Sequence, residues 1–428
     1  MKKRIALLLA VVLVVLLCAA PAMAGEKKDL LILSAPVTAG LTAAGESAVQ
    51  ESVMTPDALG TVSFANVAKR MRANNLTVLT LQQSVDTLED IDYDEMKEDL
   101  RKGLNSLASQ TWNMQMMAHF EPVGSAMAAS SMQQQYDSLK QTFEDIKDGT
   151  LQEENAGLIR QLKDGQDRLV MAGESIFIAL KGMEVQEGAL ERQLNALNRT
   201  VEEMTLRHEL GQISALQLSQ IKGGRTALIS GMETLRMNIS SYKAQLEMLL
   251  GAELTGEIRL GALFEVSEEQ LDQLDLAKDL ASAKAQSYEL YAAAETLADA
   301  KEEYEDAADE YNENEKKAEF RNAKRTWQAA QYTYNDTVQN YELRFRTLYA
   351  QVGDYRQALA AARDTLSFRK DSLKAAELKN TQGTISDNAL LDAKDSVREA
   401  EEAVQTAEIN LCSAYNSYCW AKQYGILN

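Results

Sequence analysis

Apolar residues recur at alternating spacings of four and three along two long stretches of the chain, and a glycine divides each stretch. In the first stretch they are Ile176, Leu180, Met183, Leu190, Leu194, Leu197, Val201 and Met204 before Gly211, and Leu218, Ile221, Leu228, Met232, Leu235, Ile239, Tyr242, Leu246 and Leu249 after it. This spacing places apolar side chains on one face of an α-helix. A heptad pattern of such length is typical of helices that pack as coiled coils.

The second stretch repeats the arrangement around Gly383. Its apolar positions are Leu348, Val352, Tyr355, Leu359, Ala362 and Leu366 before the glycine, and Leu390, Ala393, Val397, Ala400, Val404, Ala407, Leu411, Ala414 and Tyr418 after it. Each glycine begins a Gly-x-Ile-Ser sequence, at 211–214 and 383–386. Glycine adopts the left-handed conformation that ends a helix, and the serine caps the next one. The pattern predicts two helical hairpins that turn at these positions.

The chain is predicted to contain two tandem copies of one unit, at 63–254 and 271–428, joined by a glycine-containing junction at 255–270. The sequences "SFANVAKRMRANNLTV" and "DLAKDLASAKAQSYEL" open the two copies with similar apolar spacing. No proline follows Pro122, which favours few, long helices. "TLQE" at Thr150 is predicted to cap the first long helix, and the second is predicted to start near Asn314. The predicted fold is all-α, with long antiparallel coiled-coil hairpins in two tandem repeats.

The first 24 residues have the pattern of a secretory signal peptide. Lys2, Lys3 and Arg4 precede an apolar run at 5–17, and Ala22-Met23-Ala24 offers small residues for cleavage. Residues 25–62 are rich in Ala, Ser, Thr and Gly and are predicted to form a loosely ordered lead. No later apolar run has the length of a membrane-spanning helix. The protein is therefore expected to be exported.

The net charge argues against one class of partner, and the cysteine spacing argues against a disulfide. The formal net charge of −20 argues against binding to nucleic acid, which needs clustered Lys and Arg. Cys412 and Cys419 would lie about 10 Å apart along a helix, beyond the reach of a disulfide. They are predicted to pack as small apolar residues.

The sequence contains no recognisable enzymatic motif. His119 and His208 are its histidines, and "RHEL" at 207–210 lacks the second histidine of H-E-x-x-H. We therefore expect no enzyme activity, no cofactor and no metal site. His208 is expected to pack beside a helix end, and a pH-sensitive role near the turn is the alternative.

In three features the chain resembles the TolC family of bacterial outer-membrane efflux channels. One is the opening at 63–75, and another is the basic residue followed by Gly-x-Ile-Ser and a Leu/Ala helix, seen at 207–218 and 379–393. The third is "YKAQLEMLLGAEL", which closes the first copy. The resemblance implies a homotrimer whose long helices form a tapered tunnel. In that family the hairpin turns meet a periplasmic adaptor protein, which links the tunnel to an inner-membrane pump.

Carried over to this sequence, the resemblance assigns the adaptor-docking tips to Leu210, Gly211, Gln212, Ile213, Ser214, Gly383, Thr384, Ile385 and Ser386. The family also tends to place carboxylates just past the tips, where they constrict the aperture. Asp392 matches one such place, while Gln217 and Ala389 stand at others. A ring of Asp392 side chains from three chains could select cations or hold the aperture through salt-sensitive contacts.

One departure concerns the strands that family members insert in each copy to build a membrane barrel. The corresponding segments, near 113–149 and 300–325, have the pattern of charged helices and lack alternating apolar residues. The sequence therefore predicts little or no barrel, with at most a remnant around "NMQMMAHFEPVG". Association with a membrane stays open, and the location is an outer membrane or, without a barrel, the periplasm or cell wall.

The function that this resemblance implies is the exit duct of a tripartite efflux or secretion system, which conducts solutes passively. The alternative is an exported coiled-coil scaffold of the cell envelope without transport activity. An adaptor subunit is disfavoured because the β-rich domains that flank the hairpin in adaptors have no counterpart in the sequence.

Overall fold

The computed structural model describes residues 57–58, 60–117 and 122–427, and almost all of them lie in helices. The predicted all-α fold is confirmed, with one small addition: β1 (Thr61–Val62) pairs in parallel with β2 (Arg259–Leu260). The first repeat contains α2 (Phe64–Asn74), α3 (Leu76–Glu89), α4 (Tyr93–Met117), α5 (Pro122–Asp148), α6 (Thr150–Glu209) and α7 (Ala215–Leu249). The second contains α8 (Glu268–Asp272), α9 (Leu276–Gln286), α10 (Tyr288–Tyr311), α11 (Ala318–Thr381) and α12 (Asp387–Tyr424). The predicted signal peptide lies outside the described residues.

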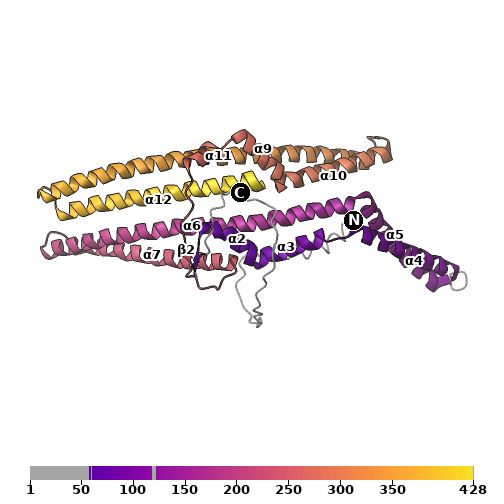
Figure 1. Ribbon diagram of the computed structural model, residues 1–428, viewed down its shortest axis with the longest axis horizontal. Helices are drawn as coiled ribbons and strands as arrows, with labels where there is room; N and C mark the ends of the chain where they lie inside the picture. The colour runs from indigo at the N-terminus through magenta and orange to yellow at the C-terminus, as the bar shows by residue number, and fades with distance from the viewer. Residues whose placement is uncertain (1–56, 59, 118–121, 428) are drawn as a thin grey trace. The chain divides into compact units, whose positions relative to one another are not determined.

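Two long hairpins, α6–α7 and α11–α12, carry the fold (Figure 1). Helix α6 has 60 residues and α11 has 64. At a rise of about 1.5 Å per residue, each is roughly 90 Å long or slightly more. Helix α12 also packs against α6, so one long helix of each repeat forms the contact between the repeats.

Each repeat has its own apolar core at the end of its hairpin away from the turn. The core of the first repeat includes Val67, Phe177 and Leu246, and that of the second includes Phe345, Leu411 and Tyr418. Trp420 and Ile426, from the end of the second repeat, are buried in the core of the first. The chain terminus therefore ties the two repeats together.

In each repeat, one residue separates two consecutive helices near the start of the repeat. The end of the last helix of the repeat packs against that residue. In the first repeat, Asn75 separates α2 from α3, and its side-chain amide donates to the carbonyl of Leu249 at 2.8 Å. Gly251, which follows, has a φ of 64°, and a Cβ on it would lie 2.5 Å from the carbonyl oxygen of Asn74. The close approach requires glycine at this position.

The second repeat uses the same arrangement with different residues. Ser287 separates α9 from α10, and Gly425, with φ of 68°, ends α12 beside it. A Cβ on Gly425 would lie 2.3 Å from the amide nitrogen of Ser287. The buried hydroxyl of Tyr341 lies within hydrogen-bonding distance of the carbonyl oxygens of Ala283 and Gly425, at 3.1 and 3.0 Å, and its one proton can be donated to either. We refer to the contact of Gly251 with Asn74 and the contact of Gly425 with Ser287 as the closure contacts.

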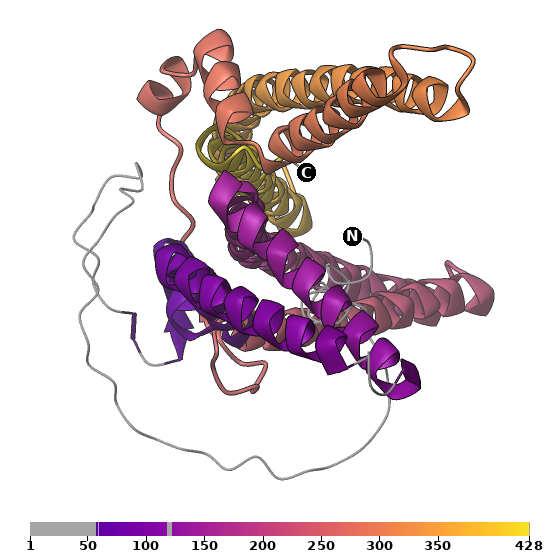
Figure 2. The same cartoon turned by 90° about the vertical axis from the view of Figure 1, so that its right-hand side faces the viewer.

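The segments where the sequence lacks strand patterns, near 113–149 and 300–325, are mainly helical among their described residues. In the first repeat α4 and α5 form a helical hairpin, and in the second α10 extends beside α11 to a turn at 312–317 (Figures 1 and 2). Tyr304 and Trp327 stack across the latter pair, with ring centroids 4.7 Å apart. No helix among the described residues combines the length and apolar character needed to cross a membrane.

The predicted start of the first long helix at Thr150 is confirmed, but the predicted cap at this residue is wrong. Gly149 is the cap of α6, and its φ of 90° allows α5 and α6 to join through this single residue. Helix α11 begins at Ala318, because the 312–317 turn, with Asn312 and Glu313 at positive φ, occupies the predicted start near Asn314.

We expect Gly425→Ala to lower the free energy of unfolding by about 2–4 kcal/mol, because the new methyl group collides with backbone and φ is unfavourable for alanine. Urea denaturation followed by circular dichroism measures the change. Gly353→Ala is the matched control: it lies within α11 with open space around it and should gain up to about 1 kcal/mol. Equal effects of the two substitutions would contradict the importance of this closure contact.

Candidate functional site

The first hairpin turns through a tight glycine motif. Helix α6 ends at Glu209, and Gly211 has φ of 71°. The amide of Gly211 donates to the carbonyl of His208 at 2.9 Å, and that of Gln212 donates to Arg207 at 2.8 Å. These bonds satisfy carbonyls at the helix end that would otherwise lack partners.

Ser214 starts the descending helix with a capping box. Its hydroxyl accepts from the amide of Gln217 at 3.2 Å, and the Gln217 side chain accepts from the amide of Ser214 at 3.0 Å. The structure thus gives Gln217, a predicted constriction residue, a local role in holding the turn.

The second hairpin has the same backbone geometry. Gly383 also has φ of 71°, its amide donates to Asn380 at 2.8 Å, and that of Thr384 donates to Lys379 at 2.9 Å. The hydroxyl of Ser386 accepts from the amide of Ala389 at 3.2 Å. The predicted turn chemistry is therefore present at both glycines.

A side chain that precedes each glycine also holds the turn. Nδ1 of His208 lies 3.1 Å from the carbonyl oxygen of Ile213, and Nδ2 of Asn380 lies 3.4 Å from that of Ile385. The two residues occupy equivalent places, since each precedes its glycine by the same spacing. Asn380 was missed by the sequence reasoning, although aligning the two motifs would have paired it with His208.

The predicted tip residues come together at the two turns, and most of them face solvent. Gly211, Gln212, Ser214, Gly383, Thr384 and Ser386 are exposed, as is Leu210, while Ile213 and Ile385 are half-buried. Leu206, Leu210, Leu216 and Leu378 are all more than half exposed. The tips therefore present apolar side chains around a well-satisfied backbone.

Ion pairs join the two hairpins just behind the tips. Arg199 on α6 pairs with Asp395 on α12, and its Nη2 is also 3.8 Å from Asp392. One heptad further on, Arg192 binds both carboxylate oxygens of Glu402, with nitrogen–oxygen distances of 2.9–3.2 Å. Bidentate pairs of this kind fix the register of two helices. The predicted constriction residue Asp392 has a side chain that is 78% exposed and lies at the edge of this row of ion pairs between α6 and α12.

The heptad spacing of the charged residues in the sequence could have indicated these ion pairs. Arg192 and Arg199 on one helix, like Asp395 and Glu402 on the other, are one heptad apart, as in charged positions beside a coiled-coil core. The apolar pattern alone does not reveal these ion pairs.

Glu174 forms a buried polar contact between the same two helices, nearer the cores. Its carboxylate accepts from Nε1 of Trp420 at 2.7 Å and from Nδ2 of Asn416 at 2.9 Å, and the residue is 7% exposed. Burial raises the pKa of Glu174, and the two hydrogen bonds and nearby Arg72 oppose this only in part. Burial likewise raises the pKa of Asp167, the ion-pair partner of Arg72, to about 6.

Cys412 and Cys419 are both free thiols on α12, as predicted. Cys412 is 1% exposed, and burial raises the pKa of its thiol to about 12. The thiol is therefore protonated at neutral pH and packs as an apolar group.

We expect His208→Ala to weaken the first turn by about 1 kcal/mol, because the carbonyl of Ile213 loses its side-chain contact. His208→Asn should retain the contact, as Asn380 does in the second turn. Hydrogen exchange at the amides of 211–214 measures both effects. Equal exchange rates in the alanine and asparagine variants would contradict the assigned role.

We expect acidification from pH 7 toward 5 to stabilise the fold through Glu174. Its folded-state pKa is raised, so the cost of its charge is present above that pKa, shrinks as pH falls through it, and is gone below the ordinary value of 4.5. Glu174→Gln, which still accepts a hydrogen bond from Trp420, should reduce this pH dependence. Asp167 contributes in the same direction and remains in the variant. Urea denaturation at a series of pH values tests the expectation, and an unchanged slope would refute it.

Comparison with known proteins shows the fold. No protein-family model and no curated protein sequence matches the chain. Among solved structures, the outer-membrane channel OprN is similar with a TM-score of 0.53 and 13% sequence identity, over 85% of this chain and 90% of that chain. A membrane protein from Pseudomonas aeruginosa is similar with a TM-score of 0.51 and 12% identity, over 84% of this chain and 90% of that chain. The predicted TolC-like fold is therefore confirmed: the chain has the helical fold of an outer-membrane channel such as OprN.

Proposed function

We propose that the chain is the exit duct of a tripartite efflux or secretion system. The observation that carries this proposal is the pair of tandem long hairpins, whose fold extends over 90% of the OprN channel. In this function the protein conducts solutes passively, and a partner pump supplies the energy. The predicted signal peptide would export the chain to the cell envelope.

Exposed apolar side chains on the long helices support assembly into a homotrimer. Those on α7 include Leu216, Ile229, Met237 and Met248, and those on α11 include Tyr332, Leu343, Phe368 and Leu378, each at least 37% exposed. Apolar side chains exposed along a long helix offer a surface that a neighbouring copy can cover in an oligomer. In a closed ring, α7 of one copy would cover α11 of the next, with a lumen between the copies.

The two tips support docking to an adaptor protein. Exposed leucines surround Gly211 and Gly383, while the backbone of each turn is internally satisfied. A rigid turn with apolar surroundings can bind the apolar end of another helical hairpin without an ordering cost. Asp392 would lie near the aperture of the trimer, where Arg199 would limit its free charge.

We expect Leu210→Asp combined with Thr384→Asp to reduce export to the level of a deletion strain, because charge at both tips opposes apolar docking. The glycines are left intact, so the turns should still fold. Leu254→Asp is the control, since Leu254 is 66% exposed between α7 and β2 and far along the chain from either turn. Export is measured as drug resistance in cells that carry the neighbouring adaptor and pump genes.

Native mass spectrometry of the purified variants completes the test. A trimer that exports normally with charged tips would refute docking through these turns. A monomer, with no change in export when the gene is deleted, would instead identify the scaffold function.

A further inference from the structure

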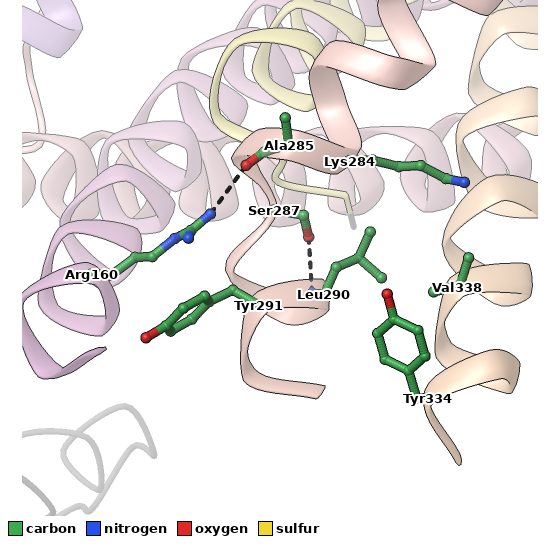
Figure 3. A pocket seen from close by; sticks show the side chains of 8 residues that line it. All are labelled: Arg160, Lys284, Ala285, Ser287, Leu290, Tyr291, Tyr334 and Val338. Atoms are coloured by element: carbon green, nitrogen blue, oxygen red, sulfur yellow. Dashed lines mark hydrogen bonds between the residues drawn. The ribbon is translucent and has the colours of Figure 1, made fainter. Parts of the chain in front are cut away.

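The first repeat meets the second through α6, along much of the length of that helix. Far from the turns, Arg160 on α6 donates to the carbonyl oxygen of Ala285 at 3.2 Å, and its guanidinium lies 4.4 Å from the ring centroid of Tyr291 (Figure 3). Nearer the turns, Arg192 and Arg199 bind carboxylates of α12. Near the turns, the contact between the repeats is therefore made by the first long helix of one repeat and the last helix of the other.

The tandem repeat gives each helix near one turn a counterpart near the other. Residues are equivalent when each lies the same number of positions from its own turn glycine, Gly211 or Gly383. Helix α11 is thus the counterpart of α6, and α7 is the counterpart of α12. The four helices pack in the order α11, α12, α6 and α7, so α11 and α7 are the outer helices of one chain (Figure 1).

The outer face of α11 carries a projecting aromatic ring between two carboxylates. Asp364 and Asp371 are the counterparts of Arg192 and Arg199, and Phe368 lies between them on the same face, at helical spacings of four and three. All three residues are exposed, Phe368 by 64%. Asp364 forms no ion pair among the described residues, and Asp371 binds only an exposed lysine of its own helix. We refer to these three residues as the α11 face.

The outer face of α7 is formed by small residues. Gly223 and Ser230 are the counterparts of the two α12 carboxylates that bind arginine, and Ala227 lies between them. All three are exposed, and a Cβ on Gly223 would meet nothing within 4 Å. Lys222 is exposed beside them and forms no ion pair within the part of the chain that the structure describes. We refer to Gly223, Ala227 and Ser230 as the α7 face.

The α11 face and the α7 face are complementary in shape and in charge. We propose that Phe368 of one copy packs on Gly223 and Ala227 of a second copy, and that Asp371 pairs there with Lys222. The ring then acts as a knob and the small residues form its hole, at the place where ion pairs join the repeats within the chain. The contact rests on the proposed trimer, and it names the residues through which neighbouring copies meet.

Disulfide cross-linking of the full mature chain tests this contact. A chain with Phe368→Cys is co-expressed with a chain with Ala227→Cys, so that a disulfide between the two substitutions joins two copies. We expect a cross-linked dimer after mild oxidation, and none from either chain alone. In the matched control, Thr234→Cys replaces Ala227→Cys. Thr234 is exposed on the same side of α7, one heptad or about 10 Å further along the helix, and should give at least about tenfold less product.

A charge exchange tests the contact with Phe368 left in place. We expect Asp371→Lys and Lys222→Asp each to lower the fraction of trimer in native mass spectrometry. The two substitutions in one chain should restore it, because the ion pair between copies forms again with its charges reversed.

The outcomes separate this contact from the proposed function. A trimer in which Thr234→Cys cross-links as well as Ala227→Cys, and in which the charge exchange restores nothing, overturns the contact and leaves the proposed trimer intact. A chain that is monomeric without any substitution overturns both.

Discussion

The closure contacts are the constraint on which both repeats depend. The turn of each long hairpin fixes the register of its two helices, but it does not determine where the other end of the hairpin meets the first helices of the repeat. Gly251 against Asn74 and Gly425 against Ser287 fix that meeting point, because backbone meets backbone there at close range. The helix breaks at Asn75 and Ser287 make room for these glycines, and the apolar core of each repeat lies around its closure contact.

The seam between the repeats has a different chemistry. Close backbone contact fixes each repeat internally, whereas charged and polar side chains join α6 to α12 along most of their shared length. Glu174 is buried and desolvated, while Arg192–Glu402 and Arg199–Asp395 are partly exposed. Such contacts contribute less stability than apolar packing but define partner and register. Salt and pH therefore act on this contact, and they also act on ion pairs inside a repeat such as Arg72–Asp167.

Much of this fold could be predicted from the sequence because the signals were local. Heptad spacing indicated the long helices, and Gly-x-Ile-Ser indicated the turns at Gly211 and Gly383, with the serine caps. The closure contacts could not be predicted in this way, since Gly251 and Asn74 meet only after the chain has folded back through both long helices. Thr150 was wrongly predicted as a cap because "TLQE" fits the local rule, while the tertiary path requires the positive φ that Gly149 provides. The tip residues were found from their motif, but the contact that His208 and Asn380 each make with the isoleucine carbonyl of the turn is visible only in the structure.

Gly149 also has a mechanical consequence. Helices α5 and α6 meet at this one residue, and a Cβ there would touch nothing. The direction in which the α4–α5 hairpin departs depends on this joint and on a contact beside it, where Nδ2 of Asn155 on α6 donates to the hydroxyl of Tyr93 on α4 at 2.8 Å. Helix α5 alone is a lever about 40 Å long, so a few degrees of rotation at its base displace its far end by several ångströms. Substitutions at Gly149 or Asn155 can therefore re-aim the hairpin while leaving both turns undisturbed.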